Sequence, residues 1–305
     1  MVESKKIGII IINYNTKKIT YDCINSILKN CINVPYSIVI WDNNSNDDSF
    51  SFFTDKFGEN LNIKLFQSKI NLGFGKACNQ ATLLLENYDY YLFLNPDTIL
   101  ESDIILNFIS SYEILSEIKQ IGCLGVQLYD LSHISIENKK SFPTVFEFIF
   151  SRFYFFKKAL IPKTFKFKDI EYQAVDYICG ADLFIQSNLF LKIGGFDEDY
   201  FMYYEEIDLQ YKLSQKGYTN ILLNNIGLKH IGGASLNDNT KLINLYSLES
   251  IIKYFKKHST LLEYFMLKLY LITMFPFLIL KSIILKFKSI NITYFKNLLR
   301  IILTT

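Results

Sequence analysis

Acidic and amide side chains gather at the ends of several hydrophobic segments of this chain. Carboxylates in such positions can bind divalent cations or accept protons. In open α/β sheets, ligands bind beyond the carboxyl ends of the strands. We therefore expect one site built from four segments, Asn13-Tyr14-Asn15, Asp42-Asn43-Asn44-Ser45, Leu94-Asn95-Pro96-Asp97 and Glu205-Glu206-Ile207-Asp208.

The candidate metal ligands are Asp97 and His230. Asp97 follows Pro96, which fixes φ and lacks a backbone donor, so its carboxylate is expected at the rim of the sheet. A hard divalent cation that bridges two phosphates needs only one or two protein carboxylates. The neutral imidazole of His230 could complete the metal shell. The alternatives are that Asp97 caps its own turn and that His230 is structural.

The remaining carboxylates have two interpretations each. Asp42 follows a strand and could accept a hydrogen bond from the imide N–H of a pyrimidine base, or it could cap the next turn. Glu205 and Asp208 share one face of the helix predicted over 205–215, whereas Glu206 points elsewhere. Acidic residues are frequent at helix starts because they complement the helix dipole. The acidic run alone therefore does not identify a catalytic base.

A glycine-rich segment argues against a dinucleotide enzyme. Residues 73–78 nearly match G-x-G-x-x-G, but Cys78 stands at the third glycine position. The segment also follows the third predicted strand, and no acidic residue ends a strand about twenty positions later, as ribose binding requires. A soluble oxidoreductase is thus disfavoured, and the chain has no phosphate-binding G-K-[ST] loop.

Strand and helix patterns alternate over the first part of the chain. This alternation predicts a parallel sheet with crossover helices. Later strands are expected near 179–185 and 219–223, and a helix is expected over 205–215 with Gly217 as its stop. Strands are predicted first at 7–12, 37–41, 63–67, 90–95 and 122–128, and helices at 19–28, 49–57, 75–86 and 102–116.

Residues 130–172 lose this pattern and are predicted to leave the sheet. Their aromatic run, residues 146–156, contains six phenylalanines and one tyrosine. Such a run could face an acceptor cleft or a bilayer interface, or it could pack onto the main core.

The C-terminal part has a different composition. From Ile251 onward there are nine lysine and arginine residues and one glutamate, interleaved with apolar stretches. This pattern favours an anionic membrane surface over nucleic acid, with ordinary solvated helices as the alternative. The longest uncharged stretch, 269–280, has 12 residues, fewer than the roughly 20 of a spanning helix. We expect amphipathic helices lying in the membrane plane, with a true span as the alternative.

Overall composition is that of a folded domain with a membrane-associating tail. Half of the residues are hydrophobic and 20% are charged, which excludes extensive disorder. The five cysteines form no C-x-x-C pair, so reduced core thiols are expected rather than zinc or disulfides. No signal-peptide pattern precedes residue 7, so we expect a cytoplasmic location. The expected division is 1–245 and 246–305.

In their order and spacing, these segments resemble the family 2 inverting glycosyltransferases. Within that family they are most similar to the rhamnosyltransferase-like branch, which builds bacterial surface polysaccharides. The resemblance covers roughly residues 5–240 and leaves out the tail and the aromatic run. The matching segments are residues 11–15, 41–45, 71–79, 94–97, 180–181, 194–198 and 201–209, and His230 with Gly233 and Ser235.

The resemblance implies a GT-A fold, which is a Rossmann-like, mostly parallel central sheet flanked by helices, here followed by a C-terminal amphipathic helical extension. It also implies roles for individual residues. Asp97 would be the surviving carboxylate of an Asp-x-Asp metal element, and His230 would help to hold the same Mg²⁺ or Mn²⁺. The nucleotide-sugar ligands would be Tyr14, Asn15, Asp42, Asn43, Asn71, Asn79 and Asn95.

Glu206 stands where relatives usually carry an aspartate as catalytic base. The extra methylene moves the carboxylate by about an ångström if the helix does not shift, which is enough to matter for rate. Glu205 and Asp208 are therefore kept as alternative bases.

The implied activity is transfer of L-rhamnose from dTDP-rhamnose, or of a hexose from a UDP-sugar, with inversion. The acceptor would be a glycan on a polyprenyl-diphosphate carrier, reached by a peripheral enzyme at the cytoplasmic face of the inner membrane. No nucleic acid partner is expected. The alternative is a catalytically silent sugar-nucleotide-binding or scaffold protein of a polysaccharide assembly complex.

Overall fold

The computed structural model describes residues 5–136, 139–150, 163–232, 240–284 and 292–305. It divides into two compact units. The first, here called the sheet unit, comprises Met1–Phe142, Pro162–Glu198 and Glu205–Asn237. The second, the helical unit, comprises Pro143–Ile161, Asp199–Tyr204 and Asp238–Thr305. Residues 151–156 of the aromatic run and Gly233 and Ser235 of the expected site lie outside the described residues.

The first half of the sheet unit follows the predicted alternation. Strands β1 (Ile7–Asn13), β2 (Tyr36–Asp42), β3 (Ile63–Gln67) and β4 (Tyr90–Leu94) pair in parallel in the order β3-β2-β1-β4. Strand β1 is buried along its whole length, as expected of a β-branched run covered on both faces. The connecting helices are α1 (Lys17–Asn30), α2 (Ser49–Phe57) and α3 (Phe74–Thr82).

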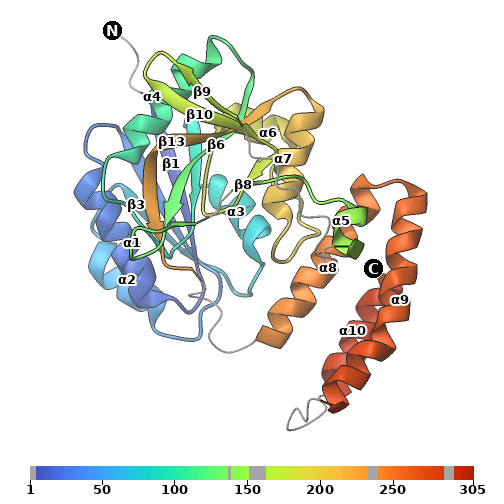
Figure 1. Cartoon of the computed structure of the whole chain (residues 1–305). Helices are drawn as coiled ribbons and strands as arrows, with labels where there is room; N and C mark the ends of the chain where they lie inside the picture. Colours follow the sequence, from blue (N-terminus) through green and yellow to red (C-terminus); the bar gives the residue numbers. More distant parts are fainter. Residues whose placement is uncertain (1–4, 137–138, 151–162, 233–239, 285–291) are drawn as a thin grey trace. The chain divides into compact units, whose positions relative to one another are not determined.

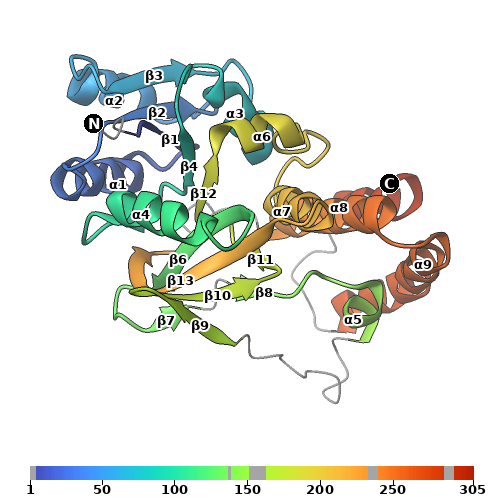
Figure 2. The same ribbon diagram turned by 90° about the horizontal axis from the view of Figure 1, so that it is seen from above.

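Helices lie on both faces of this sheet (Figures 1 and 2), and one hydrophobic cluster lies on each face. Ile9 and Ile11 of β1 pack with α1 and α2, whereas Ile10 and Ile12 pack with α3. Helix α4 (Ile104–Ser116) joins the first cluster. Helices α6 (Ser187–Ile193) and α7 (Glu205–Gln215) join the second. The period of two along β1 therefore assigns each helix to a face.

The second half of the sheet is mixed. Strand β12 (Asp182–Gln186) lies antiparallel between β4 and β6 (Ile121–Tyr129). Strand β13 (Thr219–His230) runs parallel to β6. Its end pairs with the short β5 (Thr98–Ile99), and β7 (Ser135–Ile136) pairs with β6. The α/β class is confirmed, but half of the sheet is antiparallel because β12 inserts between strands of the opposite direction.

Two boundaries differ from expectation. The residues predicted to leave the sheet return to it earlier, because β9 (Thr164–Phe167) and β10 (Ile170–Val175) form a hairpin that continues the sheet beyond β13. Strands β8 (Lys139–Lys140) and β11 (Tyr177–Ile178) form a separate pair. Helix α3 ends at Thr82, four residues before the predicted end at Glu86, because the N–H groups of residues 83–85 bond to carbonyls three residues earlier and not four.

The helical unit contains α5 (Val145–Phe150), α8 (Thr240–His258), α9 (Leu261–Ile284) and α10 (Ile292–Thr304). Helices α9 and α10 lie side by side (Figures 1 and 2), and the Lys268 ammonium on α9 donates to the Ile302 carbonyl on α10. Phe148 of the aromatic run packs within this unit, 6.0 Å from the Phe255 ring and 6.4 Å from the Tyr270 ring between centroids. The described part of the run thus contributes to the core of the helical unit.

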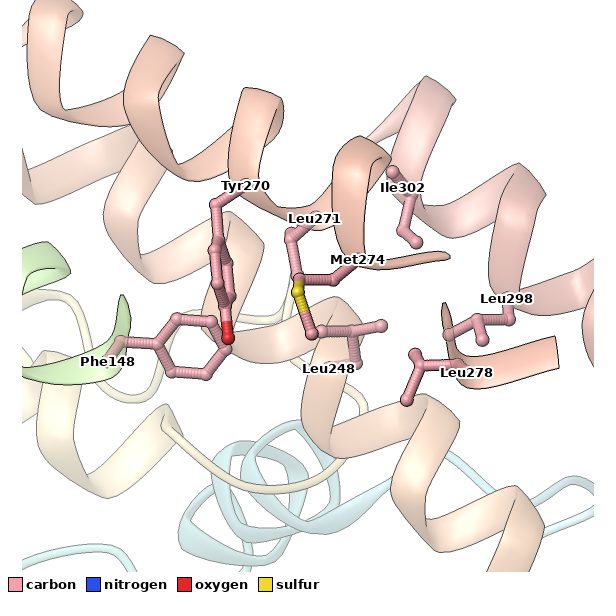
Figure 3. A pocket seen from close by; sticks show the side chains of 8 residues that line it. All are labelled: Phe148, Leu248, Tyr270, Leu271, Met274, Leu278, Leu298 and Ile302. Atoms are coloured by element: carbon pink, nitrogen blue, oxygen red, sulfur yellow. The ribbon is translucent and has the colours of Figure 1, made fainter. Parts of the chain in front are cut away.

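A cavity of about 310 Å³ lies among these helices (Figure 3). Tyr270 supplies the polar group of an otherwise apolar lining. The other side chains are Phe148, Leu248, Leu271, Met274, Leu278, Leu298 and Ile302.

Helix α9 is longer and more continuous than its charge pattern suggested. Residues Leu261–Leu280 are long and apolar enough to cross a membrane by length and composition, and 11% of that stretch is buried within the structure. The in-plane arrangement and its alternative, a membrane span, both stay predictions.

Candidate active site

The first two polar segments form one hydrogen-bonded network at the ends of β1 and β2. Asn13 and Asp42 are register partners, and the Asn13 amide donates to Asp42 Oδ1 over 2.7 Å. Ser45 donates to the same oxygen through its hydroxyl, at 2.6 Å, and to Oδ2 through its backbone N–H, at 3.1 Å. Gln67 adds a longer bond to Oδ2, at 3.3 Å. Asp42 therefore does cap its turn, as the alternative interpretation predicted.

Tyr14 and Asn15 lie beside this network. Asn15 has a φ of 55°, and its side-chain oxygen accepts the Asn46 backbone N–H at 2.7 Å. Its own N–H donates to the Ser45 hydroxyl at 2.9 Å. The ends of the first two strands are thus fastened together, and Tyr14 is presented, partly exposed, between them.

Asn43 and Asn71 hold the glycine-rich loop before α3. The Asn43 amide donates to Asn71 Oδ1 at 2.8 Å and to the Gly73 carbonyl at 3.1 Å. Asn43 Oδ1 accepts the Leu72 N–H at 3.0 Å. Gly73 has a φ of 79° and stands at the N-cap of α3, a conformation that favours glycine. The first glycine of the near-match to a dinucleotide motif is therefore explained by the turn that precedes α3.

Asn79 uses its amide for structure. Its Nδ2 donates to the Phe196 carbonyl at 2.8 Å, and its Oδ1 accepts the Phe196 N–H at 3.0 Å. This pair of bonds joins α3 to the loop after Gly195, and Glu198 lies on the same amide at 3.3 Å. The structure does not bring Asn79 into the network around Asp42, and its role in nucleotide-sugar binding stays a prediction.

Asp97 and His230 are brought together. His230 Nε2 lies 3.2 Å from Asp97 Oδ1, because β13 pairs with β5 so that His230 faces Thr98. The Ile231 N–H also donates to the Asp97 carbonyl at 2.9 Å. Both side chains are largely buried, with 10% of Asp97 and 19% of His230 exposed.

This pair fits a divalent cation that is coordinated mainly by phosphate oxygens and water. Within the described residues, no group of three or more histidine, cysteine or acidic side chains converges on one point. The carboxylate oxygen and imidazole nitrogen can occupy neighbouring positions of one metal shell, with phosphate oxygens and water in the others. Asp97 and His230 are therefore the residues that could hold Mg²⁺ or Mn²⁺.

The three acidic side chains at the start of α7 have different surroundings. Glu205 is buried against α3, where a Cβ built on Gly75 would lie 3.2 Å from Glu205 Cβ. Asp208 is fully buried and lies 2.6 Å from the Lys212 ammonium. Glu206 is partly exposed, and its Cβ and Cγ lie 3.5 Å from a Cβ built on Gly180.

Gly180 links Glu206 to the segment that carries Asp97. The next residue, Ala181, accepts the Asn95 backbone N–H at 2.9 Å through its carbonyl. Asn95 in turn accepts the Thr98 hydroxyl at 2.8 Å. The partly exposed acid of α7 and the candidate metal pair are thus connected through the adjoining ends of β4 and β12. Glu205 packs against α3, and Asp208 forms an ion pair with Lys212.

Two polar residues of this region were given no individual role by the sequence: Asn13, which belongs to an expected segment, and Asp182. Asn13 is fully buried and receives the Thr16 and Thr20 hydroxyls on its oxygen, at 3.0 and 2.8 Å. Asp182 is fully buried on β12, and one oxygen accepts the Val126 N–H at 2.6 Å. Burial raises the pKa of Asp182 well above its ordinary value. A carboxylate inside an apolar strand, directly after Gly180-Ala181, was the available signal.

Parts of this chain are similar to known glycosyltransferases. Residues 8–114 match the sequence model of glycosyl transferase family 2. Rhamnosyltransferase WbbL of Escherichia coli strain K12 is 34% identical over 155 residues, which are 48% of this chain and 55% of WbbL. The N-acetylglucosaminyl-diphospho-decaprenol L-rhamnosyltransferase of Mycobacterium tuberculosis is 22% identical over 213 residues, which are 64% of this chain and 66% of that protein. The chain thus matches just over half to two thirds of these relatives' lengths.

Solved structures show the same architecture. GalNAc-T7 with UDP, GalNAc and Mn²⁺ has a TM-score of 0.60 and 13% identity, covering 84% of this chain and 48% of that one. Staphylococcus aureus TarS 1-349 with UDP-GlcNAc has a TM-score of 0.56 and 16% identity, covering 97% and 80%. The mannosyltransferase PcManGT of Pyrobaculum calidifontis, with GDP-Man and Mn²⁺, has a TM-score of 0.54 and 14% identity, covering 84% and 64%. At these identities the likeness shows the fold alone, which is the GT-A fold, and the family 2 match is confined to residues 8–114.

Proposed function

We propose that this protein is an inverting glycosyltransferase that moves a sugar from a nucleotide donor to a lipid-linked glycan. The observation that carries the proposal is the connection between Glu206 and the Asp97–His230 pair through Gly180, Ala181 and Asn95. A displacement reaction needs a group that stabilises the leaving diphosphate and a base for the attacking hydroxyl, on opposite sides of one carbon. Glu206 lies on α7 beside Gly180, which comes shortly before β12, and Asp97 follows the end of β4.

Asp97 and His230 would bind the cation with their carboxylate oxygen and imidazole nitrogen. When bound, a divalent cation neutralises the charge that develops on the departing nucleoside diphosphate. Because backbone pairing fixes both residues, the protein holds this position without rearrangement. Solved neighbours that contain Mn²⁺ lend the proposal support at the level of the fold.

Glu206 is the proposed catalytic base. Its carboxylate accepts the proton of the acceptor hydroxyl while that oxygen attacks the anomeric carbon from the face opposite the diphosphate. A single displacement of this kind inverts the configuration. Among the three acids of α7, Glu206 is favoured because Glu205 is buried against Gly75 and Asp208 is buried beside Lys212.

The donor is proposed to be dTDP-L-rhamnose, with a UDP-hexose as the alternative. Two relatives are named as rhamnosyltransferases, which supports the first donor. In this proposal Tyr14, Asn15 and Asp42 lie beside the nucleobase of the donor. Asn43 and Asn71 shape the loop before α3, and Asn79 and Asn95 act by holding neighbouring segments.

The acceptor is proposed to be a glycan on a polyprenyl diphosphate, as in the name of the mycobacterial relative. The helical unit supplies a physical reason for a lipid-linked acceptor, because its surface is suited to binding a membrane. Helix α9 exposes a row of large apolar side chains, including Leu262 (69%), Phe265 (61%) and Leu269 (52%), and basic residues accompany it along the tail. Apolar surface with positive charge binds anionic bilayers. We place the protein at the cytoplasmic face of the inner membrane, with residues 1–245 catalytic and 246–305 membrane-associating.

The test is a transfer assay on the full chain with a panel of sugar nucleotides, Mn²⁺ or Mg²⁺, and an undecaprenyl-diphosphate-linked N-acetylglucosamine acceptor. We expect turnover, with an anomeric configuration opposite to that of the donor, and a loss of about 10²-fold or more in kcat for Glu206→Gln. Glu113→Gln, an exposed glutamate of α4, is the matched control. Donor binding without turnover in the wild type would instead indicate the catalytically silent alternative.

A further inference from the structure

The segment Asp199–Tyr204, directly before the acidic start of α7, holds an unusual backbone conformation. Tyr203 and Tyr204 have φ angles of 68° and 73°, in the left-handed region that residues with side chains rarely adopt. Two consecutive bulky residues persist there only where surrounding contacts hold them. Contacts with other elements must therefore hold this segment, which lies directly before Glu205 and Glu206.

One face of α8 provides hydrogen bonds to this segment. The Ser250 hydroxyl donates to the Met202 carbonyl at 2.8 Å. The Lys253 ammonium donates to the Asp199 carbonyl at 2.7 Å, and the Lys257 ammonium lies 2.7 Å from the Asp199 carboxylate. These residues are three and four positions apart and therefore share a helix face. The backbone of the segment is thus fixed at both Asp199 and Met202.

Aromatic side chains reinforce the same face. The Tyr246 ring lies 4.5 Å from the Phe201 ring, and the Tyr254 ring lies 5.4 Å from the Tyr204 ring, between centroids. The Lys257 ammonium lies 5.0 Å from the centroid of the Tyr200 ring. We call these five side chains, Tyr246, Ser250, Lys253, Tyr254 and Lys257, the α8 clamp.

The residues that flank the segment are fixed as well. Glu198, immediately before it, pairs with Lys76 at 2.9 Å. Glu205, immediately after it, packs against Gly75. The segment Asp199–Tyr204, which the clamp contacts, lies between these two fixed positions. A change in the φ of Tyr204 would rotate the first turn of α7, on which Glu206 lies.

We propose that the α8 clamp is a positioning device for Glu206. This inference rests on the proposed function, in which Glu206 accepts the proton of the acceptor hydroxyl. A base must lie within hydrogen-bond reach of its proton, and a misplacement of about 1 Å can cost roughly 10²-fold in rate. The clamp residues touch neither substrate nor metal in this proposal, and they act only through the segment they hold.

The test compares Ser250→Ala with Ser250→Thr in the full chain. The alanine variant removes the donor to the Met202 carbonyl, and the threonine variant keeps a hydroxyl. We expect Ser250→Ala to lower kcat about tenfold, with the donor KM changed less than about twofold, and Ser250→Thr to restore most of the loss. Ser247→Ala makes the same chemical change one turn away on α8 and is the control. Lys253→Met is a second variant, which keeps the side-chain length and removes the donor to Asp199.

Hydrogen–deuterium exchange gives a readout that does not need turnover. Backbone amides of residues 199–208 should exchange faster in Ser250→Ala and Lys253→Met than in the wild type or Ser247→Ala, with the sheet unchanged. A wild type without turnover would contradict the proposed function itself. A wild type that turns over, with wild-type kcat in both clamp variants, would overturn the positioning role alone. Unchanged exchange at 199–208 would also overturn it.

Discussion

His230 Nε2 lies 3.2 Å from Asp97 Oδ1, and backbone pairing brings the two residues to neighbouring positions. Antiparallel pairing places His230 opposite Thr98, and the Ile231 N–H bonds the Asp97 carbonyl at 2.9 Å. Asp97 lies in the short turn between β4 and β5, and the β5–β13 pairing holds this turn beside His230. This is the preorganisation that a metal-assisted displacement requires, because the protein need not reorganise as charge develops.

The first prediction concerns this pair. Asp97→Ala should lower kcat by about 10²–10³-fold, because the charge on the leaving diphosphate loses its counter-ion. His230→Ala should raise the Mn²⁺ concentration for half-maximal activity by about tenfold or more, with kcat at saturating Mn²⁺ less affected. Activity measured against Mn²⁺ concentration separates the two effects. His133→Ala, an exposed histidine near Glu101, is the control, and an equal response in His133→Ala would contradict the assignment.

The second prediction distinguishes Glu206 from Glu205 by adding volume beside each. A methyl group on Gly180 would touch Glu206 at 3.5 Å, an ordinary contact, so Gly180→Ala should be tolerated. Gly180→Val should displace the Glu206 carboxylate and lower kcat about 10- to 100-fold. Gly180 has no positive φ, so backbone strain should not lower the melting temperature.

Gly75→Ala provides the comparison. Its Cβ would meet Glu205 Cβ at 3.2 Å and Phe196 Cβ at 3.0 Å, so it presses on the other glutamate. If Glu206 is the base, kcat per folded molecule should fall more in Gly180→Val than in Gly75→Ala. The reverse order, measured with circular dichroism as a check on folding, would assign the base to Glu205.

Local patterns were sufficient for the first half of the fold. Apolar runs separated by helical periods predict β1 to β4 and their parallel direction, because a helix that crosses over between two strands returns the chain in the same direction. The direction of β12 and the β9–β10 hairpin could not be obtained this way. The partners of β12, which are β4 and β6, and the place of β10 beside β13 are distant in sequence, and a short apolar strand carries no signal for its orientation.

The site, too, has features that local sequence patterns predict and features that depend on contacts distant in sequence. Asp97 was placed correctly at a strand end from Pro96 and the preceding apolar run, because both are local signals. Its partnership with His230 came from the resemblance and depends on the β5–β13 pairing. Asn79 illustrates the limit, since its amide bonds Phe196, a contact that residue type alone does not reveal. Its family position could not distinguish ligand binding from this structural use.

The third prediction follows from Asp182. Burial raises its pKa well above the ordinary value, since the charged form is desolvated. In the unfolded chain the carboxyl group titrates at about pH 3.9. Between that pH and the higher folded pKa, the folded state holds one more proton than the unfolded state. The free energy of unfolding therefore decreases as pH rises through this window, by up to about 1.4 kcal/mol per pH unit.

Asp182→Asn removes this titration while keeping an acceptor for the Val126 N–H. The melting temperature of the variant relative to wild type should therefore rise as pH increases from 4 to 7. Thermal unfolding followed by circular dichroism across this range measures it. Asp169→Asn, an exposed aspartate between β9 and β10, should give no such trend. A difference between Asp182→Asn and wild type that is constant with pH would contradict the buried, protonated carboxyl group.

The last prediction concerns α9 and the membrane. Leu262, Phe265 and Leu269 share one exposed face of the helix, and each buried apolar side chain contributes about 1.5–3 kcal/mol when it enters lipid. Replacing all three with glutamine should lower partitioning onto anionic phosphatidylglycerol vesicles by roughly 100-fold or more, without loss of helix content. The matched control replaces an equal number of exposed apolar residues of the sheet unit, Ile32, Leu61 and Leu83. Vesicle co-sedimentation is the measurement, and equal losses in both triple variants would contradict membrane docking through α9.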